Sequence, residues 1–401
     1  MIFPEGFWLG TGSSSVQLEG AAETSDWGGW ERERRVPPSR QGAGFADRAA
    51  ADLALVRDLG LDHVRLTLEW ARIEPANGEI DGAAVDRYRD LLATANDLGL
   101  AVWVTLVDGS LPGWFAVDER GWRDERARNR LWPRHVEQCA EHFGDLAAGW
   151  VPIARPTQST ATGHLGGSTP PGDRHLGRFR ETLLGVRLAQ LDAWRVLRGG
   201  GAPVVAWHDV AIGRAVNQDP EASAATARVD ETWWGWLEAY RDGIVRVPET
   251  SPARADAHRD AFDVIGLSWV GSYDVDIEGG LTPRPDRSLD DLGLALRRVA
   301  EDGPDRPIVL FGERVGSGDD GADRARLAAK VRMLAEAVDD GVRLVGSTVE
   351  PFIDGYEWAE GFAPGRGLLD ADRTPRATAE LLGAVARGEL SDGDLAEAAT
   401  T

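Results

Sequence analysis

Carboxylates, arginines and tryptophans occur repeatedly where short apolar runs of this sequence end. Asp108, Glu313 and Glu350 stand at or just beyond the end of such runs, and Arg65 and Arg155 lie in or after similar ones. Two carboxyl groups can act together at the anomeric centre of a glycoside, one protonating the leaving oxygen and the other attacking or activating water. Tryptophan faces stack on the C–H surfaces of sugars. The combination indicates carbohydrate chemistry.

The elements that must position these residues alternate regularly along the whole chain. Short β-branched or aromatic runs are followed by longer amphipathic ones, such as residues 84–98, where Val85, Tyr88 and Leu92 repeat on one face. Several helical patterns are followed by a glycine, which suits a left-handed C-terminal cap: Gly60, Gly99 and Gly341. The predicted strands are Phe7–Ser14, His63–Trp70, Ala101–Asp108, Gly149–Arg155, Pro203–Val210, Phe262–Val270, Pro307–Glu313 and Val342–Val349.

These alternating units, with no long linker between them, predict an α/β fold: a single (β/α)8 TIM barrel over residues 1–388. The polar, acidic and Ala-rich tail of residues 389–401 is expected to be loosely attached. Because the C-terminal ends of barrel strands face one mouth, the side chains at these ends should meet there. They are Gln17, Arg65, Asp108, Arg155, His208, Asp209, Trp269, Glu313 and Glu350.

The balance of charge is strongly acidic, with a net charge of −22 over 401 residues. An acidic protein repels phosphates, so neither nucleic acid nor an anionic membrane is an expected partner. The single cysteine, Cys139, excludes an internal disulfide framework, and the N-terminus lacks a secretory signal pattern. We therefore expect a cytoplasmic protein. The histidines form no metal-binding motif, and we expect neither a metal nor another cofactor.

Lysine is almost absent from the chain, which uses arginine for its basic positions. Lys330 is the only lysine, and it lies in a helical stretch away from the predicted strand ends. Barrel enzymes that work through a Schiff base need a lysine at a strand end, so that class is excluded.

Several short motifs stand in order along the chain: Phe3–Gly10 with Gln17–Gly20, Arg65–Pro75, Thr105–Pro112, Trp150–Pro156, Pro307–Glu313 and Asp354–Leu368. Together they resemble glycoside hydrolase family 1, from Phe3 to about Leu382. The resemblance implies a β-glycosidase in which Glu313 is the nucleophile. It also implies that Gln17 and Glu357 bind sugar hydroxyls and that Trp358 is a platform for the sugar.

The chain departs from the family pattern at several of these positions. Ala154 and Arg155 stand where the family has Asn-Glu, so the amide that reads the 2-hydroxyl and the acid/base carboxylate are both missing. Trp269 replaces the tyrosine that supports the nucleophile. Asp108 stands in the place of a histidine, and Glu350 in that of a stacking tryptophan. The resemblance therefore implies an altered site.

The charged residues at these positions allow several roles. Burying an unpaired carboxylate is costly, so Glu313 should have a cationic partner, and Arg65 is the candidate. Arg155 is interpreted as a clamp for an anionic substituent, as a structural partner of Asp108 or Glu313, or as a stabiliser of a good leaving group. Asp108 and Glu350 are candidates for the lost acid. The alternative is that they balance Arg155 or Arg314.

The leading prediction is a glycosidase that acts on the O-glycosidic bond of a β-glycoside. Its partner would be a small-molecule glycoside or sugar, with an anionic or activated substrate as a variant. The catalytic candidates are Glu313, Glu350 and Asp108. The binding candidates are Gln17, Arg65, Arg155, Trp269, Glu357 and Trp358. The alternatives are a non-catalytic carbohydrate-binding or sensing barrel and a transglycosidase.

Overall fold

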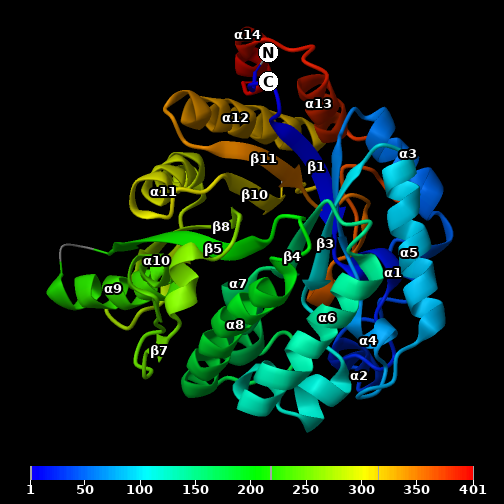
Figure 1. Ribbon diagram of the computed structural model, residues 1–401. Coiled ribbons are helices and arrows are strands. Elements are labelled where there is room, and N and C mark those ends of the chain that lie inside the picture. The colour runs from blue at the N-terminus through cyan, green and yellow to red at the C-terminus, as the bar shows by residue number, and fades with distance from the viewer. Residues whose placement is uncertain (1, 217–218, 315, 401) are drawn as a thin grey trace.

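The computed structural model describes residues 2–216, 219–314 and 316–400. Parallel strands converge at its centre, and helices surround them (Figure 1). The strands pair in the order β4-β3-β2-β1-β11-β10-β8-β5, and a parallel bridge between Trp150 and Val204 joins the two end strands. The strands are β1 (Trp8–Ser13), β2 (His63–Thr67), β3 (Ala101–Val107), β4 (Gly149–Ile153), β5 (Val205–Ala215), β8 (Val264–Val275), β10 (Ile308–Glu313) and β11 (Leu344–Val349). The predicted (β/α)8 barrel is confirmed.

Helices follow the strands and cover the outside of the barrel (Figure 1). The longer ones are α3 (Ala49–Asp58), α5 (Gly82–Asp97), α6 (Trp132–Phe143), α8 (Leu176–Leu197), α9 (Pro220–Trp234), α11 (Ser288–Asp302), α12 (Asp320–Asp339) and α13 (Ala377–Ala386). The shorter ones are α1 (Ser15–Glu19), α2 (Asp26–Arg32), α4 (Trp70–Ile73), α7 (Pro156–Ala161), α10 (Trp236–Asp242) and α14 (Asp392–Ala398). No helix of the described residues is long and apolar enough to cross a bilayer.

Helix α5 illustrates how the local sequence forms these elements. The side chain of Asp81 accepts hydrogen bonds from the first free backbone N–H groups, which caps the helix at its start. Val85, Tyr88 and Leu92 are buried on one face. The turn after the helix contains Gly99 with a φ of 76°, the left-handed conformation expected there.

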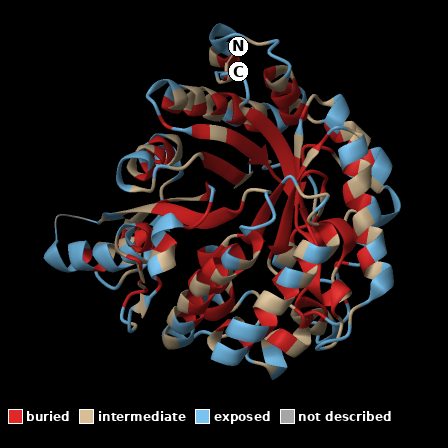
Figure 2. Ribbon diagram, viewed as in Figure 1, coloured by how far each residue is buried: buried red, intermediate tan, exposed pale blue. Residues whose placement is uncertain are grey.

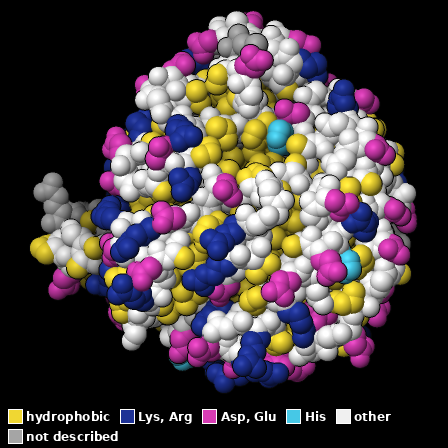
Figure 3. Space-filling model, in the orientation of Figure 1, with side chains coloured by type: hydrophobic (Ala, Val, Ile, Leu, Met, Phe, Trp, Pro, Cys, Tyr) yellow, Lys and Arg dark blue, Asp and Glu magenta, His cyan; other side chains and the backbone are white. Residues whose placement is uncertain are grey.

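Aromatic side chains fill the inside of the barrel below its mouth. Trp8 stacks on Trp103, and Phe311 stacks on Trp207 with ring centroids 4.8 Å apart. A larger apolar core lies between the strands and the helices, whose outer faces are exposed (Figure 2). On the visible face, acidic side chains are scattered among Lys and Arg rather than gathered in one patch (Figure 3).

Two regions differ from the prediction. The tail was expected to be loosely attached, but residues 392–398 form α14, which packs on α12 with Leu395 fully buried. Strands β5 and β8 continue beyond the barrel as a long ribbon after a bulge at Val210, with β9 (Leu281–Pro283) alongside. Two small antiparallel pairs complete the structure: β6 (Ile244–Val245) with β7 (Ala253–Arg254), and β12 (Gly355–Tyr356) with β13 (Phe362–Ala363).

Candidate active site

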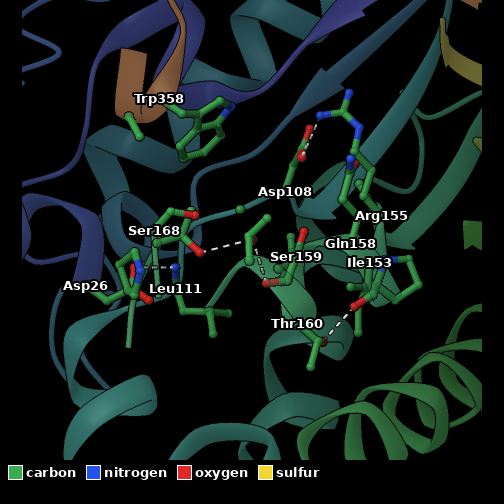
Figure 4. Close-up of a pocket in the computed structure, with 18 of the residues that line it drawn as sticks. Asp26, Asp108, Leu111, Ile153, Arg155, Gln158, Ser159, Thr160, Ser168 and Trp358 are labelled. Carbon is green, nitrogen blue, oxygen red and sulfur yellow. Dashed lines mark hydrogen bonds and ion pairs between the residues drawn. The ribbon is translucent and has the colours of Figure 1, made fainter. Parts of the chain in front are cut away.

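A cavity of about 1230 Å³ opens at the C-terminal ends of the strands. Most of the predicted site residues line it: Asp108, Arg155, Trp269, Glu313, Glu357 and Trp358. Gln17, Arg65 and Glu350 are buried and do not belong to its lining. Figure 4 shows Asp108 and Arg155 side by side on one wall and Trp358 across from them. The strand ends therefore bring these residues to one mouth, as predicted, but at different depths.

Four charged side chains form what we call the floor network: Arg65, Glu350, Arg155 and Asp108. Arg65 donates through Nε and Nη2 to the two carboxylate oxygens of Glu350, both at 2.7 Å. Its Nη1 lies 2.9 Å from Oδ2 of Asp108. Arg155 adds a contact of 2.7 Å from Nη2 to Oε2 of Glu350, and its Nη1 lies 3.8 Å from Asp108. Both guanidinium groups lie over the ring of Trp207.

The backbone makes room for this arrangement at two glycines. A Cβ atom on Gly12 would come within 3.0 Å of a Glu350 oxygen, and one on Gly312 within 3.0 Å of Nη2 of Arg155. Gly312 also has a φ of 68°, and Arg155 itself is left-handed with a φ of 45°. That conformation is unusual for a residue with a side chain. The chain thus accepts local strain where it turns Arg155 toward Glu350.

The contacts of Glu350 determine its chemistry. Burial disfavours its charged form, but Arg65 and Arg155 outweigh burial and hold the pKa of the carboxyl below its usual value. A buried carboxylate that accepts from two guanidinium groups is a poor proton donor near neutral pH. The geometry therefore does not favour Glu350 as a replacement acid. It supports the structural interpretation of Arg155, with Glu350 as the main partner.

Glu313 ends β10 and is buried at the cavity wall. Its Oε2 contacts Nζ of Lys330, which reaches over from α12. We call these two residues the wall pair. The expected pairing of Glu313 with Arg65 is wrong, because Arg65 is already committed to the floor network. The expected remoteness of Lys330 is also wrong, because its long side chain reaches the strand end from the helix that follows.

Glu357 lies between two donors at another part of the wall. Its Oε1 accepts from Nε2 of Gln17 at 3.1 Å, and its Oε2 from Nη2 of Arg314 at 2.8 Å. Burial raises the pKa of Glu357, although Arg314 opposes the shift. Of the two arginines considered as partners of Asp108 and Glu350, Arg155 is the one that contacts both, whereas Arg314 contacts Glu357. The neighbouring Trp358 packs edge-on against Trp27 at 4.8 Å between centroids.

The cavity also has residues that the sequence analysis missed. Asp26 lines it from the first turn of α2, and its Oδ1 accepts from the backbone N–H of Trp27 at 2.7 Å and of Leu111 at 3.0 Å. Burial raises the pKa of Asp26 to about 7. A wall rich in hydroxyl groups also lines the cavity: Ser159, Thr160, Thr162, Ser168 and Thr169. Figure 4 shows Ser168 close to Asp26. Only the recurrence of Ser and Thr between residues 157 and 169 marks this wall in the sequence.

The remaining candidates have structural contacts. His208 stacks on Trp236 and does not belong to the lining of this cavity, and burial lowers its pKa well below the usual value. Asp209 accepts hydrogen bonds from the backbone of Thr157 and Gln158. Trp269 lines the cavity, and its Nε1 donates to Ser288 at 2.8 Å.

The chain resembles known proteins along most of its length. It is 22% identical to β-glucosidase A of Thermotoga maritima, over 92% of this chain and 93% of that one. It is 24% identical to human lactase/phlorizin hydrolase over 96% of this chain, but spans only 24% of that protein. The structure superposes on a β-glycosidase from Pyrococcus horikoshii with a TM-score of 0.88, at 22% identity, covering 99% of this chain and 98% of that one. Residues 1–232 match the model of glycosyl hydrolase family 1. The chain therefore belongs to glycosyl hydrolase family 1.

Proposed function

We propose that the protein binds a β-glycoside in the cavity and cleaves its O-glycosidic bond by attack of Glu313 on the anomeric carbon. The observation that carries this proposal is the position of Glu313, a buried carboxylate at the end of β10 that lines the cavity together with Glu357 and Trp358. Glu357 offers carboxylate oxygens to sugar hydroxyls and is held in place by Gln17. Trp358 and Trp269 offer apolar surface to the sugar.

The step that expels the aglycone lacks a carboxylic acid in this proposal. As Glu313 forms its bond to the anomeric carbon, the bond to the aglycone oxygen breaks, and that oxygen must leave as an anion. Glu350 and Asp108 are both engaged by guanidinium groups. Loss of a general acid costs about 10²–10⁴-fold in rate. Glycosides with good leaving groups are therefore the expected substrates, and simple alkyl glycosides should react slowly.

A second candidate function is a non-catalytic carbohydrate-binding or sensing barrel. The floor network favours it, since Arg155 stands where the family resemblance expects the acid/base carboxylate and the nearby carboxylates are ion-paired. Such a protein would bind glycosides in the same cavity without cleaving them.

A covalent trap separates the two functions. A 2-deoxy-2-fluoro glycoside with a dinitrophenyl leaving group needs no acid for its first step, so it should label Glu313 stoichiometrically, as measured by intact mass. The Glu313→Gln variant should not be labelled. Glu360→Gln is the matched control, because Glu360 lines the same cavity but is exposed. Binding of the glycoside without labelling would favour the sensing barrel. The absence of both binding and labelling would contradict both functions.

A further inference from the structure

The wall pair contains the only lysine of the sequence, and this lysine lies against the carboxylate proposed as the nucleophile. Lys330 is 13% exposed and Glu313 is 3% exposed, and both line the cavity. Neighbouring basic positions on α12 are arginines, including Arg326, which pairs with Asp323. The chain therefore uses arginine at its other basic positions and lysine only beside Glu313.

The chemistry of the two basic side chains differs in a way that matters here. A guanidinium binds a carboxylate through two parallel hydrogen bonds, as Arg65 does with Glu350. An ammonium is a compact point charge. Nζ of Lys330 contacts Oε2 of Glu313, and within the described ranges no donor contacts Oε1. One oxygen of Glu313 is thus held while the other remains free.

The floor network explains why Glu313 needs this partner. Arg65 directs its donors to Glu350, Asp108 and two threonine hydroxyls rather than to Glu313. A buried carboxylate without a cation would be costly. Lys330 supplies that positive charge from the helix side of the barrel, without covering the second oxygen.

We propose that Lys330 is the positioning residue for Glu313: it anchors Oε2 so that Oε1 faces the anomeric carbon. It follows that a cationic group bound at the anomeric position would contact Oε1 and be opposed by the positive charge that Lys330 holds at Oε2. This inference rests on the proposed function, in which Glu313 faces the sugar. It can be tested without turnover, by comparing a basic sugar mimic with a neutral relative that has the same ring skeleton.

Isofagomine, a basic iminosugar, and its uncharged lactam form such a pair of probes. In Lys330→Met the repelling ammonium is gone, so isofagomine should bind about tenfold more tightly or better. Affinity for the lactam should stay within about twofold, since it carries no charge. Glu313→Gln should show the opposite selectivity, weakening isofagomine more than the lactam. Lys330→Arg should not tighten isofagomine, and by covering both oxygens it should slow labelling of Glu313 by the fluoro glycoside. Calorimetry gives the affinities.

The single lysine also allows a direct measurement on the wild-type protein. Labelling with ¹⁵N-lysine gives one side-chain Nζ resonance, which should shift in Glu313→Gln and on addition of isofagomine, but little in Glu360→Gln. This covers the case in which Lys330→Met fails to fold.

The outcomes are distinct. If the wild-type protein binds neither probe and is not labelled, both the proposed function and the role of Lys330 are refuted. If wild type binds both probes but Lys330→Met changes their affinities equally or not at all, the role of Lys330 is refuted while the sugar site stands. The role of Lys330 is also refuted if the chemical shift of its Nζ changes neither on addition of isofagomine nor in Glu313→Gln.

Discussion

The floor network and the wall pair each contain a glutamate at the end of one of two neighbouring strands, Glu350 after β11 and Glu313 at the end of β10, yet the two glutamates are left with very different chemistry. In the floor network, Glu350 accepts from two guanidinium groups, and both oxygens are in contact with them. In the wall pair, one ammonium holds one oxygen of Glu313. Glu350, after β11, is thus a structural anion, whereas Glu313, at the end of β10, is a candidate nucleophile. The number and shape of their cationic partners make the difference.

The largest expected effect comes from removing the charge of each glutamate in turn. Glu350→Gln removes the anion that both guanidinium groups contact at 2.7 Å and leaves them with Asp108 alone in a buried site, which should cost about 3–5 kcal/mol in the free energy of unfolding. Glu313→Gln leaves only the partly accessible Lys330, and should cost less than about 2 kcal/mol. Urea denaturation measures both. Equal losses in the two variants would mean that the two sites do not differ as described.

The pH dependence of stability sharpens the same comparison. The pKa of Glu350 is lower in the folded protein than its usual 4.5, so its stabilising contribution is complete above that pH and is lost as the pH falls below it. The difference in unfolding free energy between wild type and Glu350→Gln should therefore shrink in acid. Denaturation curves between neutral pH and pH 3 test this. A difference that stays constant would contradict the lowered pKa.

A smaller effect is expected at Asp26, which lines the cavity from the first turn of α2. Its pKa of about 7 means that its carboxyl gains charge as the pH rises from 6 to 8. A charged carboxylate accepts hydrogen bonds from sugar hydroxyls more strongly, so affinity for a β-linked disaccharide should rise roughly three- to tenfold over this range. In Asp26→Asn the affinity for the disaccharide should not change with pH over this range. A rise that persists in this variant would assign the titration to another group.

The fold could be predicted because its signals are local and repeated. Apolar runs such as Val102–Val107 and glycine caps such as Gly99 act within one βα unit, and the barrel follows from repeating that unit. The residues that meet at the mouth followed from the same rule, since each strand end faces the same side.

The pairing of charges could not be predicted in the same way. Arg65 lies near several acids at the mouth, and its choice of Glu350 over Glu313 depends on angstrom-scale geometry, including the space left by Gly12 and Gly312. The reach of Lys330 from α12 likewise depends on how the helix packs. Its uniqueness was visible in the sequence, but its place in a helical stretch led to the expectation that it lies away from the strand ends.

The most direct test is to locate the covalent adduct after treatment with the dinitrophenyl 2-deoxy-2-fluoro glycoside. Peptide mapping should find one sugar per protein, attached to Glu313, with no label on Glu350 or Asp108. An adduct on Glu350, or no adduct in a protein that binds the sugar, would contradict the assignment of Glu313 as the nucleophile.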